Sequence, residues 1–306
     1  SSQPEHIEFG GILPEMASRL HLRHILTLTK KALDISELNL SDISAIAVSI
    51  NPGLIGSLIV GLAFAKSLAW SLSLPLVTVN HMLAHIFANC IEHKEIKPPF
   101  LAMVVSGGHT ELVQFDTLVS FQIVGKTLDD AAGESFDKTA KLLGLGFPGG
   151  PIIDDLAKNG NPDFIRFPRA LPQKDNFNFS YSGLKTAIRT WLVNQKPEIL
   201  NDKLPDIAAS VQQAIIEPLV NKSVLWARQH KIPYILLAGG VAANSALRKQ
   251  VTQSAAKYGI KVFYPSTAFC MDNAAMVGAA AIPKFLVGDY APLTVNVSSK
   301  KGTRTV

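Results

Sequence analysis

One order of elements, strand, turn, helix, strand and helix, occurs in both halves of this chain of 306 residues. Apolar runs bounded by turn residues predict the strands, and apolar residues at three- and four-residue steps predict the helices. In the first half, after a predicted helix over 14–33, the elements are 43–50, 54–72, 76–79 and a helix from His81. In the second half they are 234–238, 242–258, 261–264 and 272–285. Because strands that alternate with helices form parallel sheets, the chain is predicted to hold two similar α/β units.

The repeat predicts the α/β, actin-like fold of actin, sugar kinases and heat-shock ATPases, in which two duplicated lobes face a cleft. We expect residues 1–100 to form lobe I, with residues 286–306 packing back on it. We expect residues 101–285 to form lobe II, which opens with a hairpin around Ser106-Gly107-Gly108-His109. The first lobe has no counterpart of this element, so a first N-terminal hairpin is predicted to be missing.

Lobe II also contains a stretch of different composition. Residues from about 146 to 231 are richer in Pro, Asn and aromatic residues than the flanking elements. Helical patterns occur in it near residues 183–193 and 204–229. We interpret the stretch as a helical insertion.

Composition limits the classes of protein to consider. Hydrophobic residues make up 47% of the chain and charged residues 17%, which excludes a disordered polymer. The longest charge-free stretch, residues 43–65, has about the length of a membrane span, but Asn51-Pro52-Gly53 interrupts it with a predicted turn. We therefore expect no membrane segment. The absence of a secretion signal and of a disulfide framework, with Cys90 and Cys270 alone, predicts a reducing interior.

The formal net charge of +5 is compatible with a polyanionic partner such as a nucleic acid. The basic tail, residues 298–304, is a candidate phosphate contact. A short basic tail is more often simply solvated, so the charge alone does not decide between these alternatives.

Two histidines at positions i and i+4, His81 and His85, are predicted on one face of a helix, where both can bind one metal ion. In the zinc peptidase signature a Glu follows the first His, whereas Met82 stands here, so a hydrolytic site would lack its base. The duplication places Asp272 at the matching helix of the other half. Two His and one Asp leave coordination positions open and suit iron or zinc. The alternatives are two polar residues on a helix face and, for Asp272, a helix N-cap.

Glycine-rich turns predict a nucleotide site. Ser106-Gly107-Gly108 follows a strand, and Gly239-Gly240 connects a strand to a helix. Backbone N–H groups approach anions closely where no side chain obstructs them. Four carboxylates lie within residues 129–137, partly because acidic residues favour the first turns of a helix. We expect Asp137 and Asp154 to bind ribose hydroxyls.

Together these motifs resemble the bacterial-type tRNA threonylcarbamoyladenosine transferases, a family formerly called O-sialoglycoprotein endopeptidases. The resemblance covers essentially the whole chain, in order. The motifs that carry it are His-Met-Leu-Ala-His, Val-Ser-Gly-Gly-His-Thr, Gly-Glu-Ser-Phe-Asp-Lys, Phe-Pro-Gly-Gly-Pro, Phe-Ser-Tyr-Ser-Gly-Leu-Lys, Ala-Gly-Gly-Val-Ala-Ala-Asn and Met-Asp-Asn-Ala-Ala.

The resemblance implies an actin-like fold and one divalent metal ion per subunit, Fe²⁺ or alternatively zinc, bound by His81, His85 and Asp272. It also implies nucleotide contacts from a larger set of residues: Val104, Val105, Ser106, Gly107, Gly108, Asp137, Gly150, Asp154 and Asn244. The implied reaction transfers the threonylcarbamoyl group from threonylcarbamoyl-AMP to N6 of adenosine 37 in tRNAs that read codons beginning with A, and AMP leaves. No covalent nucleophile or general base is assigned.

The implied partners are tRNA, a smaller actin-like paralogue of the TsaB type and a small ATPase of the TsaE type, in the cytoplasm or an organelle of bacterial origin. One feature departs from the family pattern, and another distinguishes two branches of the family. Members begin with a strand and a Glu-Thr-Ser-Cys-Asp-Asp-Thr loop, and this sequence starts after them. The archaeal and eukaryotic branch has a Tyr just before Ser-Gly-Gly, whereas Val104 and Val105 precede that motif here, which favours the bacterial branch.

Three other functions remain open on the sequence. A metallopeptidase is disfavoured by Met82, and an ATP-using kinase of the same fold would not need the pair of histidines. A non-catalytic scaffold paralogue is disfavoured by the retained His81, His85, Asp272 and glycine turns, and mildly favoured by the predicted loss of the N-terminal hairpin.

Overall fold

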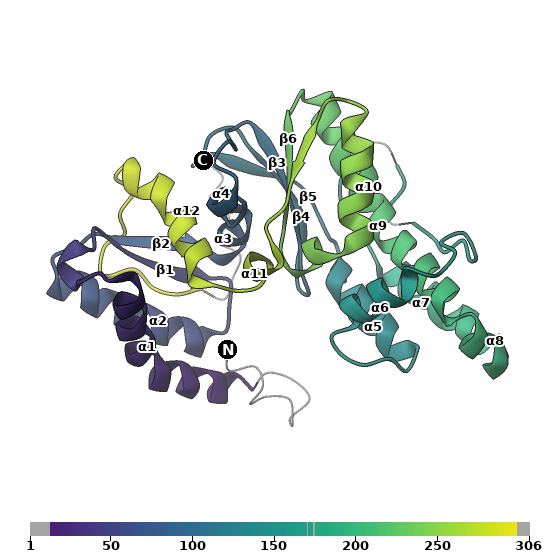
Figure 1. Cartoon of the computed structure of the whole chain (residues 1–306), viewed down its shortest axis with the longest axis horizontal. Coiled ribbons are helices and arrows are strands. Elements are labelled where there is room, and N and C mark those ends of the chain that lie inside the picture. Colours follow the sequence, from purple (N-terminus) through teal and green to yellow (C-terminus); the bar gives the residue numbers. More distant parts are fainter. Residues whose placement is uncertain (1–12, 170, 174, 299–306) are drawn as a thin grey trace. The chain divides into compact units, whose positions relative to one another are not determined.

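The structure is a computed structural model that describes residues 13–298 apart from residues 170 and 174 (Figure 1). The chain divides into two units. Unit 1 combines Ser1–Phe87 with Asn273–Val306, and unit 2 is Ala88–Asp272. The prediction of a missing N-terminal hairpin concerns a part of the chain outside the described residues.

Unit 1 is a small parallel sheet with helices packed around it. Its elements are α1 (Pro14–Ser36), the 3-10 turn η2 (Leu40–Asp42), β1 (Ile46–Asn51), α2 (Ile55–Ser71), β2 (Leu76–Asn80), α3 (His81–Phe87) and α12 (Ala274–Leu286). Strands β1 and β2 pair in parallel, with Ile46 opposite Leu76. Val48, Leu62 and Leu76 form the centre of its core. The apolar periodicity of the sequence thus folds into the predicted strand and helix order.

The C-terminal segment of the described chain lies on the unit 1 sheet. The Ala291 N–H donates to the Leu76 carbonyl at 2.8 Å, and the Ser298 N–H donates to the Ile50 carbonyl at 3.0 Å. Between them, the Lys66 ammonium donates to the Val295 carbonyl. These bonds hold the segment along both strands.

Unit 2 is built on a mixed sheet of five strands in the order β5-β4-β3-β6-β7. The strands are β3 (Phe100–Val105), β4 (Thr110–Phe115), β5 (Phe121–Lys126), β6 (Tyr234–Ala238) and β7 (Lys261–Phe263). The pairs β3–β6 and β6–β7 are parallel, and β3–β4 and β4–β5 are antiparallel. Every residue of β3 is buried. Because this central strand is covered on both faces, its sequence is apolar throughout.

The helices of unit 2 lie around this sheet. They are α4 (Asn89–Glu92), α5 (Ala132–Leu142), α6 (Gly149–Ala157), α7 (Ser182–Val193), α8 (Pro197–Asp202), α9 (Leu204–Gln229), the 3-10 turn η3 (Gly240–Ala243), α10 (Ser245–Ala256) and α11 (Thr267–Cys270). Strand β5 was not predicted, because it is an edge strand whose burial lacks a clear alternation. Among the described residues, no helix is long and apolar enough to cross a membrane.

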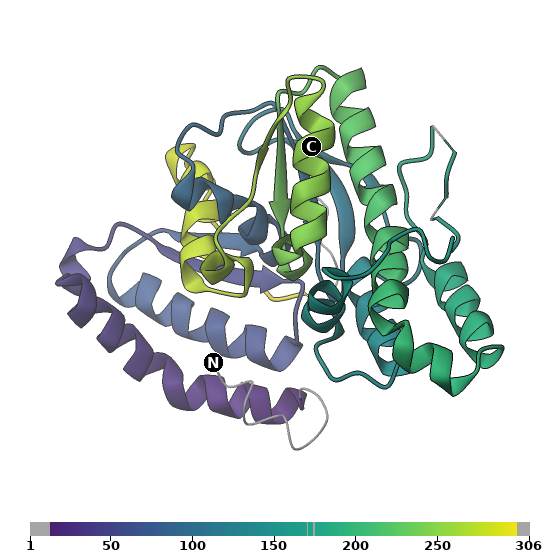
Figure 2. The same ribbon diagram turned by 45° about the vertical axis from the view of Figure 1, so that its right-hand side comes forward.

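Helix α9 forms part of the unit 2 core, although the sequence placed it in an insertion. It packs against β3, β6, α6 and α10, and Figure 2 shows it running beside α10. Ile207, Val211, Ile215 and Leu219 are completely buried along it. The surrounding irregular segments suggest an insertion in the sequence, but the helix itself covers the sheet.

The bounds of the units differ from the predicted lobes at two places: residues 88–100 lie in unit 2 and not in lobe I, and α12 differs as well. This helix lies in unit 1, whereas the prediction assigned residues 101–285 to lobe II. It packs against α3, β1 and β2, and the Lys284 ammonium donates to the Thr78 carbonyl at 2.9 Å. In the duplicated order of elements, α12 is the last helix of the second half of the chain. Its apolar face is nevertheless buried against α3, β1 and β2, which belong to the first half.

The position of α9 predicts unequal costs for two leucine truncations. Leu219→Ala should lower the free energy of unfolding by about 2–5 kcal/mol, because Leu219 is 0% exposed in the core. Leu128→Ala should change it by about 0.5 kcal/mol or less, because that side chain is 61% exposed. Urea denaturation followed by tryptophan fluorescence measures both. Equal effects would show that α9 does not belong to the core.

Candidate functional site

The helix that carries both histidines begins at a defined residue. Asn80 ends β2, and its Oδ1 accepts hydrogen bonds from the N–H groups of Met82 at 2.9 Å and Leu83 at 3.3 Å. This bonding satisfies donors that a helix start leaves without intrahelical partners. It places His81 in the first turn of α3 and His85 one turn later, on the same face.

The two imidazoles lie side by side. Their ring centroids are 4.7 Å apart in an edge-to-face arrangement. His81 is half-buried and His85 is buried. The i, i+4 spacing therefore brings together two nitrogen donors.

Asp272 is the residue before the N-cap of α12. The cap is Asn273, whose Oδ1 accepts a hydrogen bond from the Met276 N–H at 2.8 Å. The alternative in which Asp272 is the N-cap is therefore wrong. Because α12 packs against α3, the start of α12 carries the Asp272 carboxylate to the histidines.

One ligand atom from each of His81, His85 and Asp272 lies within 4.8 Å of the other two. Ligand atoms around a tetrahedral ion are about 3.4 Å apart, for bonds of about 2.1 Å. The three donors are thus near enough for rotations of their side chains to bring them around one ion. Two imidazole nitrogens and a carboxylate oxygen suit iron or zinc and leave positions open for a substrate.

Cys270 lies two residues from Asp272 but is not part of this group. Burial raises the pKa of its thiol, and the nearby Arg248 guanidinium, whose Nη2 lies 3.4 Å from Sγ, opposes the rise. A metal ligand would have to be the thiolate. The candidate centre is therefore an imidazole and carboxylate site.

In unit 2, the turn after β3 offers bare backbone. The Ser106 N–H donates to the His109 carbonyl at 2.8 Å, which closes the turn. Gly107 and Gly108 are exposed, and a Cβ added at either would meet no atom within 4 Å. Val104 and Val105 are buried in β3, so only their backbone is available to a ligand.

Two other glycines allow neighbouring elements to approach this turn. The Gly133 N–H, in the first turn of α5, donates to the Ser106 carbonyl at 3.2 Å. A Cβ at Gly133 would lie 2.5 Å from that oxygen. Gly239, at the end of β6, has a φ of +87°, and a Cβ there would lie 2.5 Å from the Val105 carbonyl oxygen. The ends of β3 and β6 and the start of α5 thus converge, and we call residues 106–108 the cradle turn.

The two predicted nucleotide-binding carboxylates, Asp137 and Asp154, each accept hydrogen bonds from the start of a helix. Asp137 accepts a hydrogen bond from the Gly149 N–H at 2.7 Å, beside Gly150 at the start of α6. Asp154 accepts from the N–H and hydroxyl of Ser245 at 3.0 and 2.8 Å. The preceding residue, Asn244, caps α10 by accepting from the Leu247 N–H at 2.8 Å.

The side chain of Asn244 also donates from Nδ2 to Gln212 at 2.7 Å and is buried. Both oxygens of Asp154 already accept from Ser245. A nucleotide would therefore have to share or replace these bonds to use Asp154 or Asn244. Within the described part of the chain, the carboxylate of Asp137 accepts one hydrogen bond, from the Gly149 N–H to Oδ1.

Asp129 has a role that the sequence did not reveal. Its carboxylate accepts from the hydroxyl of Ser180, from the Tyr181 N–H at 2.7 Å and from the hydroxyl of Ser182 at 2.8 Å. Burial alone would raise the pKa of Asp129, but these hydrogen bonds outweigh it and lower the pKa. The carboxylate thereby ties the Phe-Ser-Tyr-Ser-Gly motif to the segment that leads into α5. The acidic cluster and the motif were both visible in the sequence, but not their contact.

A profile of the family described as TsaD, tRNA N6-adenosine threonylcarbamoyltransferase, matches residues 1–279. A relative of that name from Clostridium perfringens (strain SM101 / Type A) is 47% identical over 95% of this chain and 86% of its own length. Relatives of the same name from Clostridioides difficile (strain 630) and Chlorobaculum tepidum are 46% and 45% identical over 95% and 99% of this chain, and 86% and 92% of their own lengths. The chain belongs to the tRNA N6-adenosine threonylcarbamoyltransferase family.

Membership of this family confirms the resemblance inferred from the motifs. Solved structures that are similar to the chain include full-length HypF, with a TM-score of 0.61 and 15% identity over 87% of this chain and 42% of that protein. T. kodakarensis HypF gives a TM-score of 0.65 and 16% identity over 87% and 43%. At such identities the likeness concerns the fold alone, and it supports the predicted actin-like α/β class.

The two residues at the start of α12 should separate stability from metal binding. Asn273→Ala should lower the free energy of unfolding of the metal-free protein by about 1 kcal/mol, because α12 loses its cap. Asp272→Asn should change it by about 0.5 kcal/mol or less, because the cap remains and the shape is kept. Chemical denaturation in the presence of a chelator measures both. A larger cost for Asp272→Asn than for Asn273→Ala would contradict the assignment of the cap.

Proposed function

We propose that this chain transfers the threonylcarbamoyl group of threonylcarbamoyl-AMP to N6 of adenosine 37 in tRNAs that read codons beginning with A, releasing AMP. The observation that carries the proposal is the group of His81, His85 and Asp272, whose donor atoms lie within 4.8 Å of one another in a member of this family. The relatives named above are transferases that act on tRNA adenosine. The transferase activity accounts for the group of His81, His85 and Asp272 without a peptidase or kinase function.

His81, His85 and Asp272 would hold one divalent ion, Fe²⁺ in our proposal, with zinc as the alternative. A divalent ion supplies Lewis-acid polarisation of an acyl oxygen and a fixed point for orienting the substrate. Asn80 and Asn273 position the ligands by capping α3 and α12. The buried His85 presents its ring in a fixed direction, while the exposed Asp272 keeps the centre open on one side.

The cradle turn would bind the phosphate of the adenylate through its backbone. Ser106, Gly107 and Gly108 present N–H groups without obstructing side chains, and Val104 and Val105 contribute backbone at the end of β3. These donors also stabilise the negative charge of the departing AMP. Asp137 and Asp154 would accept from ribose hydroxyls, with Gly150 and Asn244 at the two helix starts beside them.

The acceptor amine attacks the carbamoyl carbon, and no covalent intermediate on the protein is required. The proposed macromolecular partners are tRNA, the smaller actin-like paralogue and the small ATPase, without a membrane. The proposed location is the cytoplasm, with an organelle of bacterial origin as the alternative. The net charge of +5 supports a polyanionic substrate.

Removing one imidazole should abolish the reaction without unfolding the protein. His81→Ala and His85→Ala should each lower the rate of product formation by at least about 100-fold, because each removes a group that holds the reacting centre. The full chain is supplied with its partner proteins, threonine, bicarbonate, ATP and unmodified tRNA, and the modified nucleoside is measured by mass spectrometry. Bound metal is measured on the same samples and should fall with activity.

The control is His24→Ala, which replaces an exposed histidine on α1, outside the candidate centre. This variant should retain metal and activity. Product formation by His81→Ala at the rate of the control would defeat the metal centre. Failure of the unmodified chain to make the nucleoside in the complete mixture would defeat the proposed function.

A further inference from the structure

Helix α7 has one buried face and one polar, exposed face. Leu184 and Ile188 are buried in the core of unit 2, and Trp191 packs against the same core. The opposite positions are exposed, and we call them the α7 face: Gly183, Lys185, Thr186, Arg189 and Thr190. Spacing of three and four residues between the buried positions produces this division.

The charge on the α7 face is of one sign. No Asp or Glu occurs in the sequence between Asp175 and Glu198. Lys185 and Arg189 are four residues apart on the same face, where two like charges repel each other and destabilise the helix. Among the residues that the structure describes, neither forms an ion pair with a carboxylate.

Several other cations of unit 2 are matched by acids. Lys138 lies 2.7 Å from Asp130 and 2.8 Å from Glu134. Arg169 lies 2.9 Å from Glu217. Among the described residues, the two cations of the α7 face have no such acidic partner, and they lie one helical turn apart. An unfavourable arrangement of charge is consistent with a binding role for the helix.

The N-terminus of α7 lies close to the cradle turn in unit 2. The Tyr181 N–H and the Ser182 hydroxyl donate to Asp129 at 2.7 and 2.8 Å. Asp129 leads directly into α5, whose Gly133 N–H bonds to Ser106 in the cradle turn. Helices α5 and α7 also contact each other. The N-terminal end of the α7 face is therefore connected to the proposed nucleotide site through Asp129 and α5.

We infer that the α7 face binds the phosphate backbone of the tRNA substrate, with Lys185 and Arg189 as the charged contacts. This inference rests on the proposed function, which requires an adenosine of tRNA to reach an adenylate in the cradle. Phosphate oxygens accept from Lys, Arg and Thr side chains, all of which this face presents. Arg189 can donate two hydrogen bonds to one phosphate. Such contacts fix the position of the RNA without reading its sequence.

The test measures binding of unmodified tRNA to the full chain by fluorescence anisotropy over a series of salt concentrations. Lys185→Gln/Arg189→Gln should weaken binding roughly 10-fold at physiological salt and reduce the slope of log Kd against log salt by about 1 for each lost phosphate contact. In the complete reaction mixture, the KM for tRNA should rise by a similar factor while kcat stays unchanged. Lys185→Arg/Arg189→Lys, which keeps both charges, should restore the slope.

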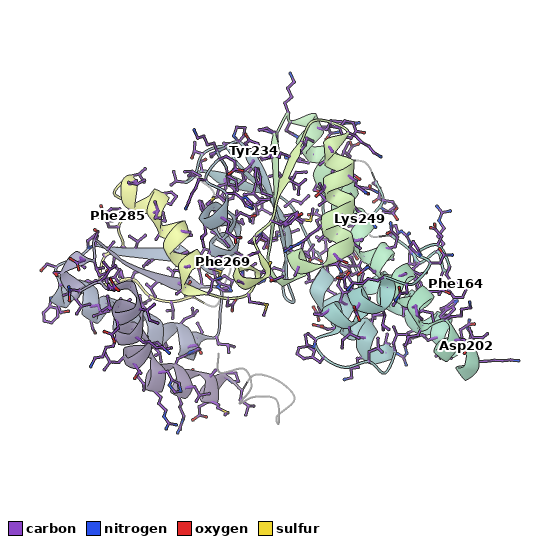
Figure 3. All side chains as sticks on the ribbon, viewed as in Figure 1. Phe164, Asp202, Tyr234, Lys249, Phe269 and Phe285 are labelled. Carbon is purple, nitrogen blue, oxygen red and sulfur yellow. The ribbon has the colours of Figure 1, made fainter. Side chains whose placement is uncertain are left out.

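The matched control is Lys249→Gln/Lys257→Gln, which removes two exposed charges from α10 and its C-cap. Figure 3 labels Lys249. It should leave the slope and the KM unchanged. The inference is overturned if the α7 variant and the wild-type chain give the same slope of log Kd against log salt for tRNA. This holds also if the α7 variant then proves to have lost binding of a protein partner. The proposed function fails separately, when the unmodified chain makes no modified nucleoside although it binds tRNA.

Discussion

The packing of α12 against α3 and β2 determines whether a carboxylate from late in the chain can meet two histidines from its first third. The apolar face of α12 and the hydrogen bond from Lys284 to Thr78 hold the helix on the unit 1 sheet. Each helix start is then fixed by an asparagine, Asn80 for α3 and Asn273 for α12. Successive helical residues are rotated by about 100°, so a cap shifted by one residue would aim a ligand away from the others.

The cradle turn depends on a different constraint, the close approach of backbone segments. Gly133 and Gly239 allow α5 and β6 to touch the end of β3, where any side chain would collide with carbonyl oxygens. Gly107 and Gly108 meet no such crowding and leave the turn open. Gly133 and Gly239 thus permit the close packing around the end of β3, and Gly107 and Gly108 leave the backbone N–H groups of the cradle turn accessible to an anion.

Local sequence patterns predicted much of the fold of unit 1 and part of the candidate metal centre. The periodicity of apolar residues located both strands and the helices of unit 1, and the i, i+4 spacing identified His81 and His85 as neighbours. Asp272 was found only by comparing the two halves of the chain, because nothing in its local sequence distinguishes a ligand from a cap. The structure rules out the cap for Asp272, because Asn273 caps α12.

The features that the sequence did not reveal depend on contacts between distant segments. Asp129 and Ser182 lie far apart in sequence, and only the fold joins them. The packing of α9 on the sheet was missed for a similar reason, since composition describes the flanking loops and not the sheet that the helix covers. Strand β5 depends on pairing with β4, which no local alternation indicates.

X-ray absorption spectroscopy of the chain loaded with Fe²⁺ or zinc tests the central claim directly, since it counts the donor atoms around the ion. The account predicts two imidazole nitrogens and light oxygen donors at about 2.0–2.2 Å, with one imidazole lost in His85→Ala. A spectrum without imidazole scattering, or one dominated by sulfur at about 2.3 Å, would contradict it.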